Sequence, residues 1–150
     1  MLFRSSIVQI ETHLDDATPQ QLGYMMERAL ALGALDVFFT PIQMKKNRPG
    51  VLITLLASPE QADALMRMLL EETPTLGVRY SLMNRRCLQR EIQTVQTEYG
   101  AVRVKYARDG ERILHLAPEY EDCAQLAQQA NAPLHAIMHA ALQKARESGD

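Results

Sequence analysis

The sequence has few cysteines, few aromatic residues and no tryptophan. Among its 150 residues are two cysteines, Cys87 and Cys123, which lie far apart and outside any CxxC spacing. This excludes a disulfide framework and a thiolate zinc site, and it is typical of a reducing compartment. Aromatic side chains make up 5% of the chain, which disfavours a surface that stacks nucleic-acid bases.

The sequence also lacks long apolar runs and an excess of either charge. It contains no run of 18 apolar residues, and the stretch from Met1 to Arg4 is too short for a signal peptide. We therefore expect a soluble, cytoplasmic protein with no membrane partner. The 16 basic residues are balanced by 18 acidic ones, for a formal net charge of −2. This balance argues against a protein that coats nucleic acid, so any anion site has to be local.

The first half of the chain alternates between strand-like and helix-like stretches. Both predicted helices begin with a hydroxyl residue, a proline and a glutamine in the spacing of a capping box, at Thr18 to Gln21 and Ser58 to Gln61. The predicted elements are strands at 7–13, 35–42, 51–57 and 78–88, and helices at about 19–32 and 59–72. Their order, βαββαβ, is that of a ferredoxin-like sandwich.

The rest of the chain predicts a smaller hairpin and two helices. Residues 92–98 and 102–106 flank Tyr99 and Gly100 as a hairpin, and a second tight turn precedes residues 113–116. Helices follow at 118–130 and 133–146. The predicted fold class is therefore α+β, with a ferredoxin-like core at about 7–88 followed by a β-hairpin extension and two C-terminal helices. We expect residues 89–150 to pack on that core as one domain.

Charged and hydroxyl side chains gather in three loops that share one end of the predicted sheet. The loops meet there because strands one and two run in one direction and strands three and four in the other. The side chains are Glu11, His13, Asp15 and Asp16 in the first loop, Lys45, Lys46 and Arg48 in the second, and Glu72, Thr73, Thr75 and Arg79 in the third.

This combination predicts a site for a metal-bound nucleotide. Carboxylate oxygens bind hard cations such as Mg²⁺ or Mn²⁺, and basic side chains neutralise phosphate oxygens. The helix start at Thr18 adds backbone donors toward an anion. Plainer interpretations exist: Asp15 and Asp16 also favour the dipole of the next helix, and a basic hairpin tip also keeps a sheet edge solvated. The concentration of all these groups at one end favours the site.

Three other side chains have both a chemical and a structural interpretation. His135 and His139 stand one helical turn apart, a spacing that allows a shared metal, but an exposed alanine-rich helix explains them more simply. Cys123 lies near a helix start, where the pKa of a thiol can fall. A buried small apolar side chain is the interpretation that we favour for it.

Four stretches resemble a known family, the nickel-insertion protein of the lactate racemase cofactor. They are ETHLDD at 11–16, TPIQMKKNRPG at 40–50, ETPTLGVR at 72–79 and PEYEDC at 118–123. They occur in the order of the family and span nearly the whole chain. The family more often has asparagine in place of His13 and threonine in place of Pro74. Its members are also longer, and the chain is similar to their C-terminal domain, the part associated with CTP.

The resemblance implies a CTP-dependent nickel-inserting enzyme, a metal chelatase of the lyase class. Its substrate is pyridinium-3,5-bisthiocarboxylic acid mononucleotide, in which carbon–nickel and sulfur–nickel bonds form. CTP is consumed to CMP and pyrophosphate with Mg²⁺ or Mn²⁺. The N-terminal domain, or a separate partner chain, completes the enzyme. Exposed strands favour a homo-oligomer, which we expect to be a trimer or a hexamer.

The resemblance and the loop charges together give a residue-level hypothesis. Asp15, Asp16 and Lys46 are the predicted catalytic residues. The predicted metal ligands are Glu11, Asp15 and Asp16. The predicted nucleotide contacts are Lys45, Lys46, Arg48, Thr73, Thr75 and Arg79, and by resemblance alone Glu119 and Asp122.

Two other functions stay open from the sequence. One is a non-catalytic, oligomeric regulatory module that binds a nucleotide without turnover. The other follows from the two C-terminal helices, whose break at 131–133 loosely resembles a helix-turn-helix. The second of these helices begins with Leu134, His135 and Ala136 and has basic residues only late, at Lys144 and Arg146. That surface is poor for contacting bases or phosphates, so we expect no nucleic-acid partner.

Overall fold

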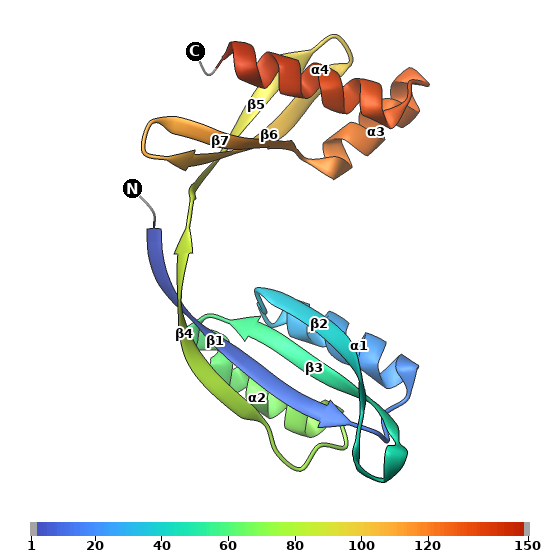
Figure 1. The fold of residues 1–150 in the computed structure, drawn as a ribbon. Coiled ribbons are helices and arrows are strands. Elements are labelled where there is room, and N and C mark those ends of the chain that lie inside the picture. Colours follow the sequence, from blue (N-terminus) through green and yellow to red (C-terminus); the bar gives the residue numbers. More distant parts are fainter. Residues whose placement is uncertain (1–2, 149–150) are drawn as a thin grey trace. The chain divides into compact units, whose positions relative to one another are not determined.

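The computed structural model describes residues 3–148, which divide into one compact unit at 4–85 and a second that consists of residues 86–148 and Phe3. Figure 1 shows the elements of each unit. They are β1 (Phe3–Leu14), α1 (Pro19–Ala31), β2 (Asp36–Gln43), a 3-10 turn (Lys45–Asn47), β3 (Pro49–Ala57), α2 (Pro59–Glu72), β4 (Arg79–Cys87), β5 (Gln89–Thr97), β6 (Gly100–Asp109), β7 (Arg112–Pro118), α3 (Tyr120–Ala130) and α4 (Leu134–Glu147).

The first unit is a four-stranded sheet covered by two helices. The strand order is β2-β3-β1-β4, and both β1 and β2 run antiparallel to β3. Helices α1 and α2 lie on the same face of this sheet (Figure 1). Strand order and connectivity are those of a ferredoxin-like sandwich, which confirms the α+β prediction. The core between the sheet and the helices includes Ile10, Met25, Ile53, Leu55, Leu65 and Leu69.

The two helix starts of this unit differ, although their sequences are alike. At α1 the predicted capping box is present: the Gln21 backbone N–H donates to the Thr18 hydroxyl at 3.2 Å, and the Gln21 side-chain oxygen accepts from the Thr18 N–H at 2.9 Å. At α2 the predicted capping box is wrong, because the Ser58 side chain caps no backbone N–H. The pKa of the nearby Glu60 carboxyl is lowered, first by the Glu60 backbone N–H and then by the Ser58 hydroxyl.

The second unit is a three-stranded antiparallel sheet, β5-β6-β7, with α3 and α4. The predicted hairpin closes where Thr97 pairs with Gly100, and β7 adds a strand beyond it. Gly100 has φ 135°, a backbone angle that favours glycine, and a Cβ there would lie 2.8 Å from a Leu126 methyl, which would have to shift. Helix α4 contacts all three strands, and the buried Tyr106 hydroxyl donates to the Ala145 carbonyl at 3.2 Å.

Element boundaries in the second unit differ slightly from the prediction. Pro118 does not begin α3, because it pairs with Val104 as the last residue of β7. Asn131 ends α3 in the left-handed conformation, with φ 48°. Among residues 3–148, no helix is long and apolar enough to cross a membrane. The expectation that residues 89–150 pack on the ferredoxin-like core stays a prediction.

Candidate functional site

The end of β1 and the β2-β3 turn lie next to each other in the sheet. Leu14 pairs with Val51 in β3, and β3 pairs with the end of β2 through Gln43 and Pro49. An ion pair joins the two loops beyond, with the Arg48 guanidinium 3.3 Å from the Asp15 carboxylate. Two of the three predicted loops are therefore in direct contact.

Arg79 connects the third loop to β1. Its Nε lies 3.0 Å from a Glu11 carboxylate oxygen, and its Nη1 lies 3.0 Å from Nδ1 of His13. A guanidinium has no acceptor, so Nδ1 of His13 accepts this hydrogen bond. Glu11 and His13 are two residues apart and share the sheet face opposite to that of buried Thr12. Because Arg79 already balances the Glu11 carboxylate, Glu11 has to exchange that partner before it can bind a cation.

The basic turn holds an unusual backbone. Lys46 has φ 60° and ψ 26°, and Asn47 has φ 59°. Asparagine tolerates this left-handed region, whereas for lysine it costs about 1–2 kcal/mol. A hydrogen bond between the residues on either side stabilises the turn, because the Met44 N–H donates to the Arg48 carbonyl at 2.7 Å. A Cβ at Gly50 would lie 2.8 Å from the Leu14 backbone carbonyl oxygen, so this close packing also requires glycine.

Three charged side chains at this end are free to meet a ligand. Lys45, Lys46 and Asp16 are exposed, and among residues 3–148 none of them has a hydrogen-bond or ion-pair partner. An exposed charge without a partner is common at a surface, but here two cations and an anion lie in adjoining loops beside the Asp15–Arg48 pair. The arrangement therefore offers basic groups for phosphate oxygens and carboxylates for a cation in one place.

The hydroxyl groups of the third loop are used inside the protein. Thr75 Oγ1 lies 2.6 Å from Thr12 Oγ1 and 2.8 Å from the Gly77 carbonyl, which also lies 3.1 Å from Thr12 Oγ1. Thr73 Oγ1 donates to the Leu69 carbonyl at 2.6 Å and accepts from the Thr75 N–H. Each hydroxyl has one proton, and in every arrangement of these contacts the protons of Thr73 and Thr75 are taken. In this conformation both threonines order the turn.

Thr12 is a residue that our sequence reasoning missed. Its side chain is 2% exposed and lies on the apolar, helix-covered face of β1 with Val8 and Ile10. A polar residue at an inward position of a strand is a usable signal, because a buried hydroxyl needs a partner. Its partners belong to the turn that precedes Arg79.

The predicted nucleotide contacts of the tail lie in the other unit and are paired there. Asp122, in the first turn of α3, accepts from Arg103 Nη2 at 2.7 Å and from Arg103 Nε and the Arg103 backbone N–H at 2.9 Å. The Glu119 carboxylate lies 2.8 Å from the Lys105 ammonium. These bonds tie the start of α3 to β6, a structural role. A nucleotide contact for Glu119 and Asp122 stays a prediction, while Tyr120 beside them is 61% exposed.

The Asp122 carboxylate is expected to stabilise the second unit in a pH-dependent way. Hydrogen bonds from Arg103 lower the pKa of Asp122 to about 2, whereas an unfolded aspartate titrates near 4. The stabilisation is therefore complete above about pH 4 and is lost as the pH falls through about 2. We expect Asp122→Asn to lower the free energy of unfolding by about 1 kcal/mol at neutral pH, measured by urea unfolding.

The neighbouring Glu121 provides the control for that measurement. Glu121 is exposed in the same helical turn, and Glu121→Gln removes the same charge near the same helix end. The difference between the Asp122→Asn and Glu121→Gln proteins should shrink between pH 4 and pH 2. A difference that is independent of pH would show that the Arg103 contact does not depend on the carboxylate charge.

The reactive-thiol alternative for Cys123 is wrong. Its side chain is fully buried, and burial raises the pKa of the thiol. Among residues 3–148, no three His, Cys, Asp or Glu side chains are arranged to hold a metal ion by themselves. A cation at Asp15 and Asp16 would thus need oxygen ligands from a bound molecule, which is how Mg²⁺ is commonly held by one or two carboxylates and substrate phosphates.

Comparison with known sequences places the chain beside nickel insertion proteins. The nickel insertion protein family model matches residues 2–138. The pyridinium-3,5-bisthiocarboxylic acid mononucleotide nickel insertion protein of Lactiplantibacillus plantarum is 48% identical over 139 residues, which are 91% of this chain and 32% of that protein. The protein of the same name from Acetivibrio thermocellus is 46% identical over 134 residues, 89% of this chain and 33% of that protein. The chain spans about a third of the length of these curated relatives.

Solved structures give the same picture of the fold. LarC2, the C-terminal domain of a cyclometallase involved in the synthesis of the NPN cofactor of lactate racemase, superposes with a TM-score of 0.88 at 45% identity, covering 96% of this chain and 99% of that one. Protein MK0293 of Methanopyrus kandleri superposes with a TM-score of 0.73 at 22% identity, and the match covers 92% of this chain and 86% of that one. At that identity the second match shows only a shared fold.

Proposed function

The chain belongs to the nickel insertion protein family, and we propose that it is the part of such a protein that binds CTP together with a divalent cation. The observation that carries the proposal is the set of free charges at one end of the ferredoxin-like sheet. Lys45 and Lys46 have no partners among the described residues, and they adjoin Asp15 and Asp16 across the Arg48 ion pair.

In the proposed complex the triphosphate pairs with the charges that have no partner within the described residues. Lys45, Lys46 and Arg48 neutralise phosphate oxygens, and Asp15 and Asp16 would hold Mg²⁺ or Mn²⁺, which would neutralise further negative charge of the nucleotide. Arg48 keeps its position through Asp15, 3.3 Å away. The basic turn needs little ordering on binding, because its backbone is already held by the contacts of Met44 and Gly50.

The remaining predicted residues have different proposed roles. Arg79 reaches the ligand from β4 and shares its charge between Glu11 and the phosphate. Glu11 contributes to the metal only when Arg79 turns to the nucleotide, since the two are paired at 3.0 Å. Thr73 and Thr75 act mainly by ordering the turn before Arg79, since their protons have internal acceptors.

We propose nucleotidyl transfer as the chemistry that this site supports. A substrate oxygen attacks the α-phosphorus of CTP, the bond to the β-phosphate oxygen breaks, and pyrophosphate leaves. The basic side chains stabilise the charge that develops on the leaving group, and Lys46 acts with Asp15 and Asp16 on the reacting phosphates. No protein nucleophile is required.

The whole-protein reaction is proposed from the relatives. Nickel is a substrate, inserted into pyridinium-3,5-bisthiocarboxylic acid mononucleotide with overall conversion of CTP to CMP and pyrophosphate, as a chelatase of the lyase class. A further domain or partner chain, corresponding to the rest of the relatives' length, would complete the enzyme. A homo-oligomer, trimeric or hexameric, is part of the same proposal.

Calorimetric titration of the purified chain tests the nucleotide proposal. We expect saturable binding of CTP that is tighter than that of ATP or GTP and that weakens strongly when Mn²⁺ is omitted. Equal affinity for the three nucleotides would remove the assignment to CTP. Absence of binding under all conditions would overturn the proposal for this chain. Binding by the complete enzyme without any turnover of CTP would favour the regulatory module instead.

A further inference from the structure

Two histidines occupy the outward face of α4. The opposite face of this helix is fixed to the sheet of the second unit by Ile137, Ala141 and Ala145, which are fully buried. His135 and His139 are both exposed and are four residues apart in the helix. At this spacing two side chains are neighbours on one helical face, with Cβ atoms roughly 5–6 Å apart. The spacing matches two zinc-binding histidines of a helix in metalloproteases.

Both imidazole rings are available to a ligand. Among residues 3–148, neither His135 nor His139 has a hydrogen-bond or ion-pair partner. The chain has four histidines, and the other two differ: His13 accepts a hydrogen bond from Arg79, and His115 stands alone on β7. The pair on α4 is therefore the one place in the described residues where two free imidazoles lie within reach of one ion.

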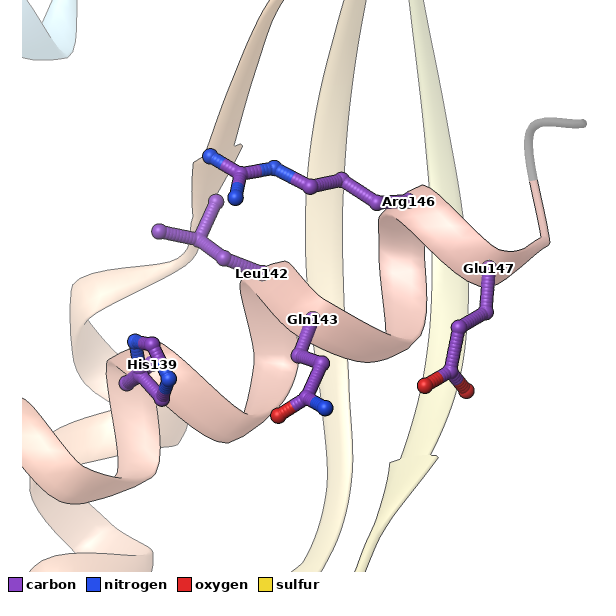
Figure 2. A pocket seen from close by; sticks show the side chains of 5 residues that line it. All are labelled: His139, Leu142, Gln143, Arg146 and Glu147. Carbon is purple, nitrogen blue, oxygen red and sulfur yellow. The ribbon is translucent and has the colours of Figure 1, made fainter.

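The surface beside His139 is hollowed. A depression of about 410 Å³ is lined by His139, Leu142, Gln143, Arg146 and Glu147 of α4, and Figure 2 shows Leu142 and Arg146 extending above the helix and Gln143 and Glu147 below it. Glu147 is 2.9 Å from Lys144 and is thereby balanced. The depression leaves room at His139 for ligands that the protein does not supply, with the amide of Gln143 and the guanidinium of Arg146 at its border.

The chemistry of this pair differs from that of the loops at the sheet end. Carboxylates of Asp15 and Asp16 suit hard cations, whereas imidazole suits zinc, copper, iron and nickel. A protein that handles both a nucleotide-bound Mg²⁺ or Mn²⁺ and Ni²⁺ needs to keep the two apart. The oxygen ligands belong to the first unit and the two histidines to the second, so the two kinds of ligand are on different units of the chain.

We propose that His135 and His139 form a surface site for Ni²⁺, which binds through one nitrogen of each ring and keeps its other positions open to water or to sulfur and oxygen atoms of a small molecule in the adjoining depression. The identity of the metal rests on the proposed function, whereas the existence of the site rests on α4 alone. Two protein ligands give an open, exchangeable site, as suits an ion that is passed on.

Titration of Ni²⁺ into the untagged full chain tests the site. We expect one Ni²⁺ ion per chain to bind in a way that depends on both histidines. His135→Ala and His139→Ala should each weaken Ni²⁺ binding by at least about tenfold, because losing even a residue that only supports a metal ligand has an effect of about this size. His115→Ala, which removes an unpaired exposed histidine, should leave the affinity unchanged. Excess Mg²⁺ should not displace Ni²⁺, while Cu²⁺ should, since it binds nitrogen ligands more tightly. Circular dichroism checks that both variants keep their helices.

Failure of this proposal is separable from failure of the proposed function. Ni²⁺ affinity that is the same in the chain, His135→Ala and His139→Ala would overturn the site, and so would a lack of saturable Ni²⁺ binding. Neither result touches the nucleotide proposal, which is measured with CTP and Mn²⁺ in the same proteins and should not change in the histidine variants. Conversely, Ni²⁺ binding that needs both histidines would stand even if no nucleotide bound.

Discussion

Replacing Lys46 by alanine is expected to weaken CTP binding by about 1–3 kcal/mol, or roughly 5- to 150-fold, with the fold intact. Lys46 is exposed and has no partner among the described residues, so its removal breaks no internal contact. The loss would come from one charge-assisted bond to a phosphate oxygen. Calorimetry with CTP and Mn²⁺ measures it, and unchanged affinity in the folded variant would remove Lys46 from the site.

The left-handed backbone at Lys46 allows a sharper version of this experiment. Lys46→Gly removes the same ammonium but relieves a conformation that costs a side-chain residue about 1–2 kcal/mol. Alanine keeps that cost at φ 60°. Both variants should lose the same affinity for CTP, while only the glycine variant gains stability. If the glycine variant alone lost affinity, the rigid backbone of the turn, and not the charge, would carry the effect.

Two further variants complete the set. Lys46→Arg keeps a cation and should retain most of the affinity. Arg67→Ala changes the net charge by the same amount at an exposed position of α2, away from the loops, and should bind CTP normally. A loss of affinity in Arg67→Ala equal to that in Lys46→Ala would indicate a general effect of net charge, which is screened by salt.

Local sequence signals predicted the elements of the fold well, because their causes lie within a few residues. The capping box at Thr18 and the hairpin turn before Gly100 are of this kind. The failure at Ser58 shows the limit of such signals. The same residue pattern precedes both helices, yet the Thr18 side chain caps a backbone N–H and the Ser58 side chain does not, so the pattern alone does not decide whether the cap forms.

The pairing of charges was beyond sequence reasoning for a different reason. The topology indicated that Glu11, Asp15, Arg48 and Arg79 share one end of the sheet. Which carboxylate pairs with which guanidinium depends on strand register and on side-chain rotamers. The paired residues are also far apart in the sequence, by 33 residues for Asp15–Arg48 and by 68 residues for Glu11–Arg79. These pairings decide which groups stay free for a ligand. Only the structure therefore shows that Lys45, Lys46 and Asp16 are the unpaired charges of the candidate site.

The second large effect is expected from a residue that no ligand can reach. Thr12→Val removes a hydroxyl that is 2% exposed and lies 2.6 Å from Thr75 Oγ1 and 3.1 Å from the Gly77 carbonyl. Loss of the hydrogen bonds of the Thr12 hydroxyl should lower the free energy of unfolding by about 1–2 kcal/mol. It should also loosen residues 73–77, on which the placement of Arg79 depends, and so weaken CTP binding by roughly fivefold, or about 1 kcal/mol.

Matched variants separate positioning from a general loss of stability. Thr54→Val makes the same change at a threonine that is 3% exposed in the adjacent β3. It should leave CTP affinity unchanged. Thr12→Ser restores the hydroxyl and should recover the affinity even though it loses a buried methyl group. If Thr12→Val were destabilised but bound CTP normally, the hydroxyl network would hold the turn without positioning Arg79. Equal affinity losses in Thr12→Val and Thr54→Val would show instead that CTP binding follows the stability of the sheet, and the role of Thr12 in the site would be excluded.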